Sequence, residues 1–357
     1  MPLLPSIPAR RLARRRPTPA AALLLVLAAR ALAAPEPQAA AREWMMGTIA
    51  DVRIYAAPNL GAARHALEAA LAELRRIDRL MAIQRPESDV SRLNREGARG
   101  PVAVDRRVIE VVQRSIEVSR LTGGAFDVTV LPVVRAWGFD GPHPRRPATA
   151  PPRPAGYGAL EVDEAAATIR FKAPDAGVDL GGIAKGYALD RAREVLRARG
   201  VRSAWIDLGG NVATLGLPPG APRWRIGVRD PRRSGGILGV IETLEAAVST
   251  SSDAERFVDD EAGRAGHVID PRSGRPANAL VTATVVAGSA TLADALSTAA
   301  VVMGRERFVM LARRLDVEAL LGSASTRGDL QLTSTPGLRF EPGNSRETGE
   351  GEQCTEQ

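Results

Sequence analysis

The stretch "VDLGGIAKGYALD", residues 178–190, has the pattern of a turn between a short apolar strand and a helix. Its glycines let the backbone approach a ligand closely, and the first turn of the following helix presents unpaired N–H groups to an anion. Lys185 adds a positive charge within that turn, which suits a phosphate. The turn alone is also typical of an ordinary helix start with Asp179 as its hydrogen-bond acceptor, so both interpretations stay open.

Helix and strand patterns continue on both sides of this turn without a strict βαβ repeat. The apolar spacing predicts strands at 48–56, 159–172, 203–209 and 224–229, and helices at 63–81, 105–124, 182–199 and 291–304. The proline-rich segment 141–158 fits neither element and predicts an exposed loop. We therefore expect a mixed α/β (α+β) fold.

The first 34 residues have the pattern of an export signal. A basic segment precedes an apolar segment that is too short to span a bilayer comfortably, and small residues follow where a signal peptidase would cut, near Ala33 or Ala34. A retained N-terminal membrane anchor and export by the twin-arginine route stay open as alternatives. Cys354 is the only cysteine and lies far from this segment, which excludes lipid attachment at the cleavage site and a disulfide framework.

The formal net charge of +7 is concentrated in the same N-terminal segment. Six arginines and no acidic residue lie within residues 1–34, so these arginines account for all but one of the seven charges. The rest of the chain has no basic stripe with interleaved aromatic residues. The composition therefore argues against a nucleic-acid-binding protein, and the N-terminal segment predicts that the chain works outside the cytoplasm.

A second cluster, "AGSATLADALSTA" at 287–299, places Asp294 and Thr298 four residues apart on one face of a predicted helix. One carboxylate, one hydroxyl or carbonyl oxygen and substrate phosphates would suit Mg²⁺, which usually keeps several waters. The alternative is a capped, alanine-rich packing helix whose Asp294 bonds a neighbouring loop.

A third cluster contains His267, followed by the turn "DPRSG". Of the three histidines, His65 falls in an alanine-rich helix and His143 in the proline-rich loop, so His267 is the one placed to act as a general base. A strand-end histidine satisfied by the turn is the alternative interpretation. Asp253 and Asp270 are competing candidates for the base.

Taken in order, these motifs resemble the ApbE family, the FAD:protein FMN transferases of bacterial envelopes, from about Trp44 to Leu321. The resemblance rests on eight segments: "MMGTIADV" (45–52), "RPESDVSRLN" (85–94), "GGAFDVTVLPVVRAWGF" (123–139), "VDLGGIAKGYALD" (178–190), "WIDLGGNV" (205–212), "STSSDAERF" (249–257), "HVIDPRSGRP" (267–276) and "LADALSTA" (292–299).

This resemblance implies FAD as the substrate, Mg²⁺ as the cofactor, and transfer of FMN to a threonine or serine of another protein with release of AMP. The expected partner is an exported or membrane-bound redox protein. Two alternatives remain: a Mg²⁺-dependent FAD pyrophosphatase that uses water as the acceptor, and a non-catalytic protein that binds or delivers flavin. The family's FAD contacts fall on Met46, Ala125, Phe126, Asp127, Asp179, Lys185 and Val268, its metal positions fall on Gly182, Asp294 and Thr298, and His267 is the expected catalytic base.

The sequence departs from the family pattern in two places. Gln84 stands before "RP", where the family often has an aromatic residue, and an amide cannot replace ring stacking on the flavin or adenine. The proline-rich loop at 141–158 replaces a segment that often holds a short helix. We expect a catalytic domain at 40–325 and a polar, loose C-terminal tail at 326–357.

Overall fold

A computed structural model describes residues 36–253, 255–261, 263–325 and 329–343. From Pro37 onward the described residues belong to one compact unit. The export signal predicted for residues 1–34 lies outside the described residues. Within the described ranges, no helix combines the length and the apolar character that crossing a bilayer requires.

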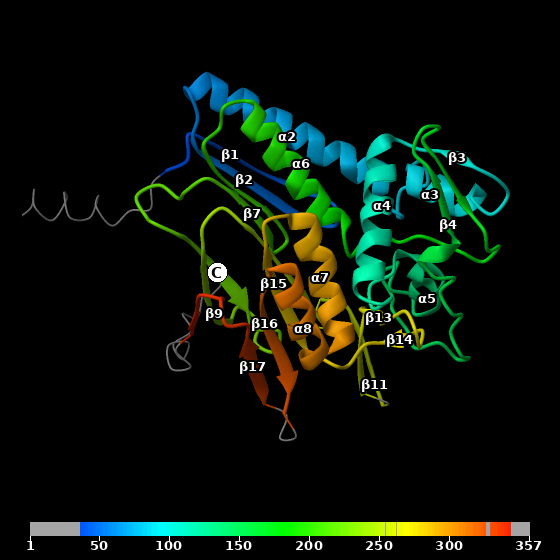
Figure 1. Ribbon diagram of the computed structural model, residues 1–357. Helices are drawn as coiled ribbons and strands as arrows, with labels where there is room; N and C mark the ends of the chain where they lie inside the picture. The colour runs from blue at the N-terminus through cyan, green and yellow to red at the C-terminus, as the bar shows by residue number, and fades with distance from the viewer. Residues whose placement is uncertain (1–35, 254, 262, 326–328, 344–357) are drawn as a thin grey trace, which may run out of the picture. The chain divides into compact units, whose positions relative to one another are not determined.

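An eight-stranded antiparallel sheet organises the fold (Figure 1). Its strand order is β1-β2-β6-β7-β10-β15-β16-β17, which places the first strand of the chain at one edge of the sheet and β17 at the other. The strands are β1 (Ala39–Met45), β2 (Thr48–Ala56), β6 (Ser203–Leu208), β7 (Asn211–Leu215), β10 (Ala247–Ser252), β15 (Thr282–Ala287), β16 (Glu318–Ala324) and β17 (Leu330–Ser334).

Helices form a layer on one face of this sheet, and Figure 1 shows α2, α6, α7 and α8 following one another along it. They bury their apolar stripes: α2 alone buries Leu67, Leu71, Leu74 and Ile77 at three- and four-residue steps. The helices are α2 (Leu60–Met81), α3 (Asp89–Glu96), α4 (Arg106–Leu121), α5 (Leu131–Ala136), α6 (Ala184–Ala198), α7 (Ala290–Met303) and α8 (Arg305–Leu315).

A second sheet, β18-β9-β8, packs on the opposite face of the large sheet. Side chains from both sheets form a separate apolar cluster that includes Val212, Val248 and Ile226, and the rings of Trp205 and Trp224 lie 5.8 Å apart. The strands are β8 (Trp224–Arg229), β9 (Ile237–Thr243) and β18 (Phe340–Pro342). The large sheet is therefore covered on both faces.

Smaller elements complete the helical side of the unit. A three-stranded sheet, β3-β5-β4, lies near α3 and α4, and two hairpins follow β10. These elements are β3 (Val102–Ala103), β4 (Leu160–Asp163), β5 (Thr168–Phe171), β11 (Phe257–Asp260), β12 (Gly263–Gly266), β13 (Ile269–Asp270), β14 (Arg275–Pro276) and the 3₁₀ turns η1 (Val128–Val130) and η2 (Tyr157–Ala159).

The expected mixed α/β fold is confirmed. The strands and helices predicted by residue range all appear within a few residues of their expected bounds, with 159–172 divided into β4 and β5. The predicted loose tail at 326–357 is wrong for its described part. β17 pairs with β16 and β18 pairs with β9, because the short strands find open sheet edges to hydrogen-bond. The rest of that tail, 326–328 and 344–357, lies outside the described residues.

Candidate active site

The turn before α6 does not follow a regular strand, although the sequence predicts one there. Instead, the side-chain amide of Asn94 takes the place of a neighbouring strand: its Oδ1 accepts from the Val178 N–H at 2.7 Å, and its Nδ2 donates to the Val178 carbonyl at 2.8 Å. Asp179 Oδ1 accepts from the Gly181 N–H at 2.8 Å, so this carboxylate stabilises the turn and not the helix start. Lys185 lies in the first turn of α6, and its Nζ donates to the Gly181 carbonyl at 3.3 Å.

Close contact between α6 and α7 brings Asp294 beneath this turn. A Cβ atom at Gly186 would lie 2.1 Å from the Ala290 carbonyl oxygen, so only glycine permits the approach. Asp294 Oδ2 accepts from the Gly186 N–H at 2.8 Å, and Oδ1 accepts from Asn211 Nδ2 at 3.0 Å. Ser249 adds a longer hydrogen bond to Oδ1 at 3.3 Å. The buried carboxylate is thus fixed by α6, β7 and β10 together.

Asp190, four residues after Gly186, holds the start of α7. Its carboxylate accepts from the Ser289 hydroxyl at 2.7 Å, the Ala290 N–H at 2.9 Å, and both the N–H and the hydroxyl of Thr291 at 2.8 and 2.7 Å. An acceptor here satisfies donors that the first helical turn leaves unpaired. Ser289 is itself the N-cap of α7.

Thr298 lies one turn after Asp294 and faces the glycine turn. The hydroxyl of Thr298 is 3.2 Å from where a Cβ atom of Gly182 would lie, and Ser251 Oγ is 3.2 Å from the same hydroxyl. The hydroxyl oxygens of Thr298 and Ser251 are ligands of the kind that Mg²⁺ prefers. Among the described residues, Asp294 Oδ2 has one hydrogen-bond partner, the Gly186 N–H, which leaves it a lone pair for a metal.

A metal at this place would need ligands from outside the protein. Within the part of the chain that the structure describes, no three His, Cys, Asp or Glu residues cluster as a protein-only metal cage. Mg²⁺ is commonly held by one or two carboxylates together with substrate phosphates and water. The residues present therefore fit a metal that shares its coordination with substrate oxygens.

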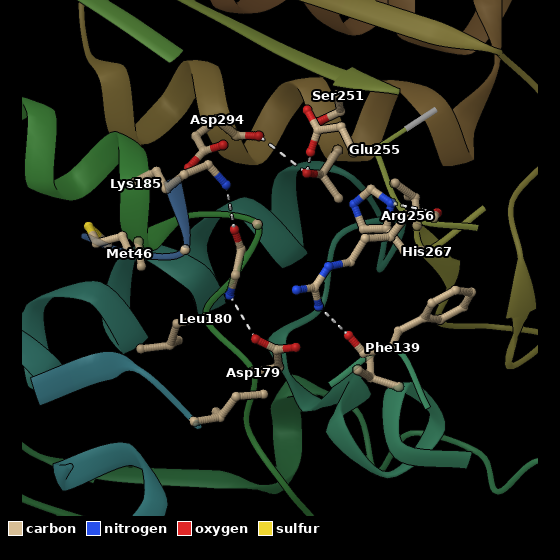
Figure 2. A pocket seen from close by; sticks show the side chains of 18 of the residues that line it. Met46, Phe139, Asp179, Leu180, Lys185, Ser251, Glu255, Arg256, His267 and Asp294 are labelled. Carbon is tan, nitrogen blue, oxygen red and sulfur yellow. Dashed lines mark hydrogen bonds between the residues drawn. The ribbon is translucent and has the colours of Figure 1, made fainter. Parts of the chain in front are cut away.

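His267 is half-buried at the opposite side of the cavity from Lys185 (Figure 2). Its backbone N–H donates to the Arg256 carbonyl at 2.9 Å, and Nδ1 is 3.3 Å from the same oxygen. Because a carbonyl only accepts, Nδ1 carries the proton and Nε2 keeps its lone pair. Burial first, and then repulsion from Lys185, lowers the pKa of His267 from its usual 6.5 to about 4. The imidazole is therefore neutral at pH 7.

Two carboxyl groups of the cavity are held in environments that favour protonation. Burial raises the pKa of Asp179, although the Gly181 N–H and the Lys185 ammonium partly offset it. Burial also raises the pKa of Glu255. The positive charge of Lys185 partly offsets this effect, and the negative charge of Asp294 raises the pKa further. Lys185 is thus the cation that both carboxyl groups face.

The β1–β2 turn supplies another wall. Met46 has a positive φ of 52°, and its N–H donates to Asp78 Oδ1 at 3.0 Å. Arg85 binds the other oxygen of Asp78 at 2.8 Å, so α2 fixes both the turn and the segment that contains Gln84. On a different wall, Asp127 accepts from the N–H groups of Thr129 and Tyr157, both at 2.8 Å, and thereby joins η1 to η2.

One cavity of about 800 Å³ collects these groups, a volume within the usual range for ligand sites. All of the predicted residues line it: Met46, Ala125, Phe126, Asp127, Asp179, Gly182, Lys185, His267, Val268, Asp294 and Thr298. Gln84 lines it as well, whereas Asp253 and Asp270 do not. Geometry therefore favours His267 over its two competitors as the base.

The chain matches the ApbE family over residues 46–321. It belongs to the ApbE family. The FAD:protein FMN transferase of Vibrio cholerae serotype O1 is 32% identical to it over 286 residues, which cover 77% of this chain and 84% of that protein. The FAD:protein FMN transferase of Klebsiella pneumoniae is 33% identical over 276 residues, covering 75% of this chain and 85% of that protein.

Solved ApbE structures share the fold. The ApbE protein of Thermotoga maritima aligns with a TM-score of 0.73 at 30% identity, covering 82% of this chain and 96% of that one. The flavin transferase ApbE from Vibrio cholerae aligns with a TM-score of 0.72 at 27% identity, covering 84% and 97%. The resemblance that the eight motifs predict is thereby confirmed. The roles of the individual site residues stay predictions.

Several residues that shape this ApbE site were missed at the sequence level. Asn211 and Asp190 stand inside quoted motifs, but their contacts with Asp294 and with the start of α7 span 83 to 101 residues, so no local pattern reveals them. Arg85, Glu255 and Arg256 also line the cavity. The sequence could have indicated these three residues as site candidates, because each is a charged residue within one of the eight motifs.

Proposed function

We propose that this chain is an FAD:protein FMN transferase, which moves FMN from FAD to a threonine or serine hydroxyl of another protein and releases AMP. The observation that carries the proposal is that Lys185, a neutral His267 and the side-chain oxygens of Asp294 and Thr298 line one cavity. Relatives at 32% and 33% identity bear this enzyme name.

The reaction requires one bond to form and one to break at the same phosphorus. The acceptor oxygen bonds to the phosphorus on the FMN side, while the bond from that phosphorus to the oxygen of AMP breaks. The acceptor's proton passes to a base, and AMP leaves. No redox change occurs, so the protein must position the two oxygens in line and stabilise charge on the phosphates.

His267 is the proposed base. Its Nδ1–H is held by the Arg256 carbonyl, which leaves Nε2 to accept the hydroxyl proton. A pKa of about 4 keeps the imidazole unprotonated at neutral pH, although it also makes His267 a weak base. Its contribution is therefore greatest when the proton is transferred late, as the leaving group departs.

Lys185, in the first turn of α6, would hold the pyrophosphate, whereas the N–H groups of Ala184 and Gly186 are already hydrogen-bonded within the protein. Mg²⁺, held by Asp294, Thr298 and the Gly182 carbonyl, would neutralise phosphate charge and stabilise the departing AMP. Lys185 lies three residues after Gly182, so the cation and the proposed metal position would act on the same group.

The proposed partner is an exported or membrane-bound redox protein, because the predicted N-terminal signal directs the chain out of the cytoplasm. A suitable probe is a soluble acceptor domain with an aspartate, small residues and then a threonine, the pattern that family acceptors resemble. The same domain with Thr→Val is the matched control. The chain's own "GSAT" (288–291) lacks the aspartate and begins α7, so we assign it to the site and not to the targets.

The test mixes the purified chain with FAD, Mg²⁺ and the acceptor domain. Intact mass and in-gel fluorescence measure covalent FMN, and chromatography measures AMP. We expect equal amounts of labelled acceptor and AMP, no label on the Thr→Val domain, and loss of both products in EDTA. AMP and free FMN without labelled acceptor would establish the pyrophosphatase instead, and bound but unchanged FAD would establish a carrier.

A further inference from the structure

Next to one wall of the cavity, two segments pack on each other apart from the main core. The β11–β12 hairpin and α5 with the loop after it share a small apolar cluster of their own. Its members are Val133, Val134, Trp137, Phe139, Val258, Ala265 and Ile269. His267 follows β12 directly, so the hairpin determines where its imidazole lies.

Arg146, in the proline-rich loop, joins these two segments by polar contacts. Its guanidinium donates to both carboxylate oxygens of Asp260 at 2.9 Å and to the Gly263 carbonyl at 2.9 Å. It also lies 5.5 Å from the centre of the Trp137 ring. Asp260 ends β11 and Gly263 begins β12, so a single side chain holds the hairpin close to its tip.

A second connection joins the same segments at the base of the hairpin. Arg256 donates to the Phe139 carbonyl at 2.7 Å, and its own carbonyl accepts from the His267 backbone and lies 3.3 Å from Nδ1 (Figure 2). The Phe139 ring meets the imidazole edge-on, with centroids 6.4 Å apart. Movement of the hairpin away from the loop would therefore change the surroundings of His267 directly.

We propose that Arg146 is a positioning residue, which fixes the β11–β12 hairpin against the proline-rich loop and thereby holds His267 at the cavity wall. Isolated surface ion pairs contribute little, but this contact is bidentate, has a third hydrogen bond and covers an aromatic ring. Arg146 does not line the cavity, so it acts through the hairpin. The proposal rests on the proposed function for the role of His267.

The test compares Arg146→Gln, Arg146→Lys and the double variant Arg146→Gln/Asp260→Asn with the wild type. Arg225→Gln is the matched control, because Arg225 also joins carboxylates on two strands, Glu242 and Glu341, but lies away from the cavity. The first readout is the titration of the imidazole C–H signals by NMR. The chain has three histidines, so His267→Gln assigns the signal.

In Arg146→Gln we expect the His267 midpoint to rise from about 4 towards 6.5, because a released hairpin admits water to the imidazole. With the acceptor domain, kcat should fall about tenfold while the Kd for FAD stays within about twofold, since misplacement of a reacting group lowers rate more than binding. Arg146→Lys should recover part of both effects, and the double variant should match the single one. Arg225→Gln should match the wild type.

An unchanged His267 titration in Arg146→Gln would overturn the proposal, whatever the effect on kcat. A shift of the same size in Arg225→Gln would also overturn it, because the change would then reflect the loss of any exposed ion pair. If the wild type labels no acceptor, the proposed function fails, but the titration still tests the positioning role because it requires no turnover.

Discussion

Asp294 links the proposed metal position to the fold itself. Its carboxylate accepts from the Gly186 N–H, the Asn211 amide and the Ser249 hydroxyl, and it is 3% exposed. Removing it would leave buried donors without partners, which typically costs about 1–3 kcal/mol for each group. The same carboxylate thus stabilises the fold, and in the proposed metal site it would also bind Mg²⁺.

We expect Asp294→Ala to lower the free energy of unfolding in EDTA by about 2–6 kcal/mol, because the Gly186 N–H and the Asn211 amide lose their acceptor. We also expect it to abolish a rise in melting temperature with Mg²⁺ that the wild type should show. Urea unfolding in EDTA measures the first effect, and a thermal melt with and without Mg²⁺ measures the second. Asp175→Ala is the matched control, because Asp175 is an exposed aspartate that does not line the cavity. A Mg²⁺ response equal to that of the wild type would remove Asp294 from the metal site.

The lowered pKa of His267 predicts two dependences on pH. The imidazole stays neutral down to about pH 4, so kcat/KM for FMN transfer should stay level between pH 7 and pH 5. The unfolded chain takes up this proton near 6.5, so stability contributed by the neutral form is present above 6.5 and is lost as pH falls towards 4. Urea unfolding from pH 7 to pH 4 should therefore show a smaller loss in His267→Gln than in the wild type. A fall of kcat/KM at low pH with a midpoint near 6.5 would contradict the proposed role of His267 as a base of lowered pKa.

At the scale of elements, the site depends on how closely α6 approaches α7. Gly186 allows this approach, and Asp190 fixes the first turn of α7 from the same helix. Lys185 and Asp294 therefore lie near each other because two helices pack at a glycine. The sequence shows both helices, but it does not show which residue of one faces which residue of the other.

Gly186→Ala should separate the two helices. Its Cβ would lie 2.1 Å from the Ala290 carbonyl oxygen and 2.7 Å from Asp294 Cβ, and backbone cannot yield as a flexible side chain can. We expect a loss of about 1–3 kcal/mol in the free energy of unfolding, the usual cost of overpacking, together with weaker Mg²⁺ binding. Urea unfolding and Mg²⁺ titration measure these effects. Gly158→Ala is the matched control, since a Cβ there meets no atom within 4 Å. Equal stability of the two variants would show that the helices adjust freely.

At the scale of the whole molecule, motif order was enough to predict the family and part of the set of residues around the cavity. Each motif is local, and the predicted residues do line one cavity. The network around Asp294 was not predictable, because Asn211 lies 83 residues away in the chain and joins it only after the sheet has assembled. The strands after residue 329 were missed for a similar reason: their short polar pattern becomes a strand only where β16 and β9 offer open edges.

The final prediction concerns β17 and β18, whose loss should lower the stability of the fold without changing the affinity of the site for FAD. A chain that ends at Ser325 lacks β17 and β18, together with Leu338 and Phe340, which pack against the cluster between the two sheets. Partial burial of two such side chains stabilises a fold by about 3 kcal/mol, so its urea midpoint should fall below that of a chain ending at Gly343. The cavity contains no residue from this region, so the Kd for FAD under native conditions should be the same for both chains. A lower affinity with an unchanged midpoint would mean that these strands support the site and not the sheet, the reverse of what their contacts predict.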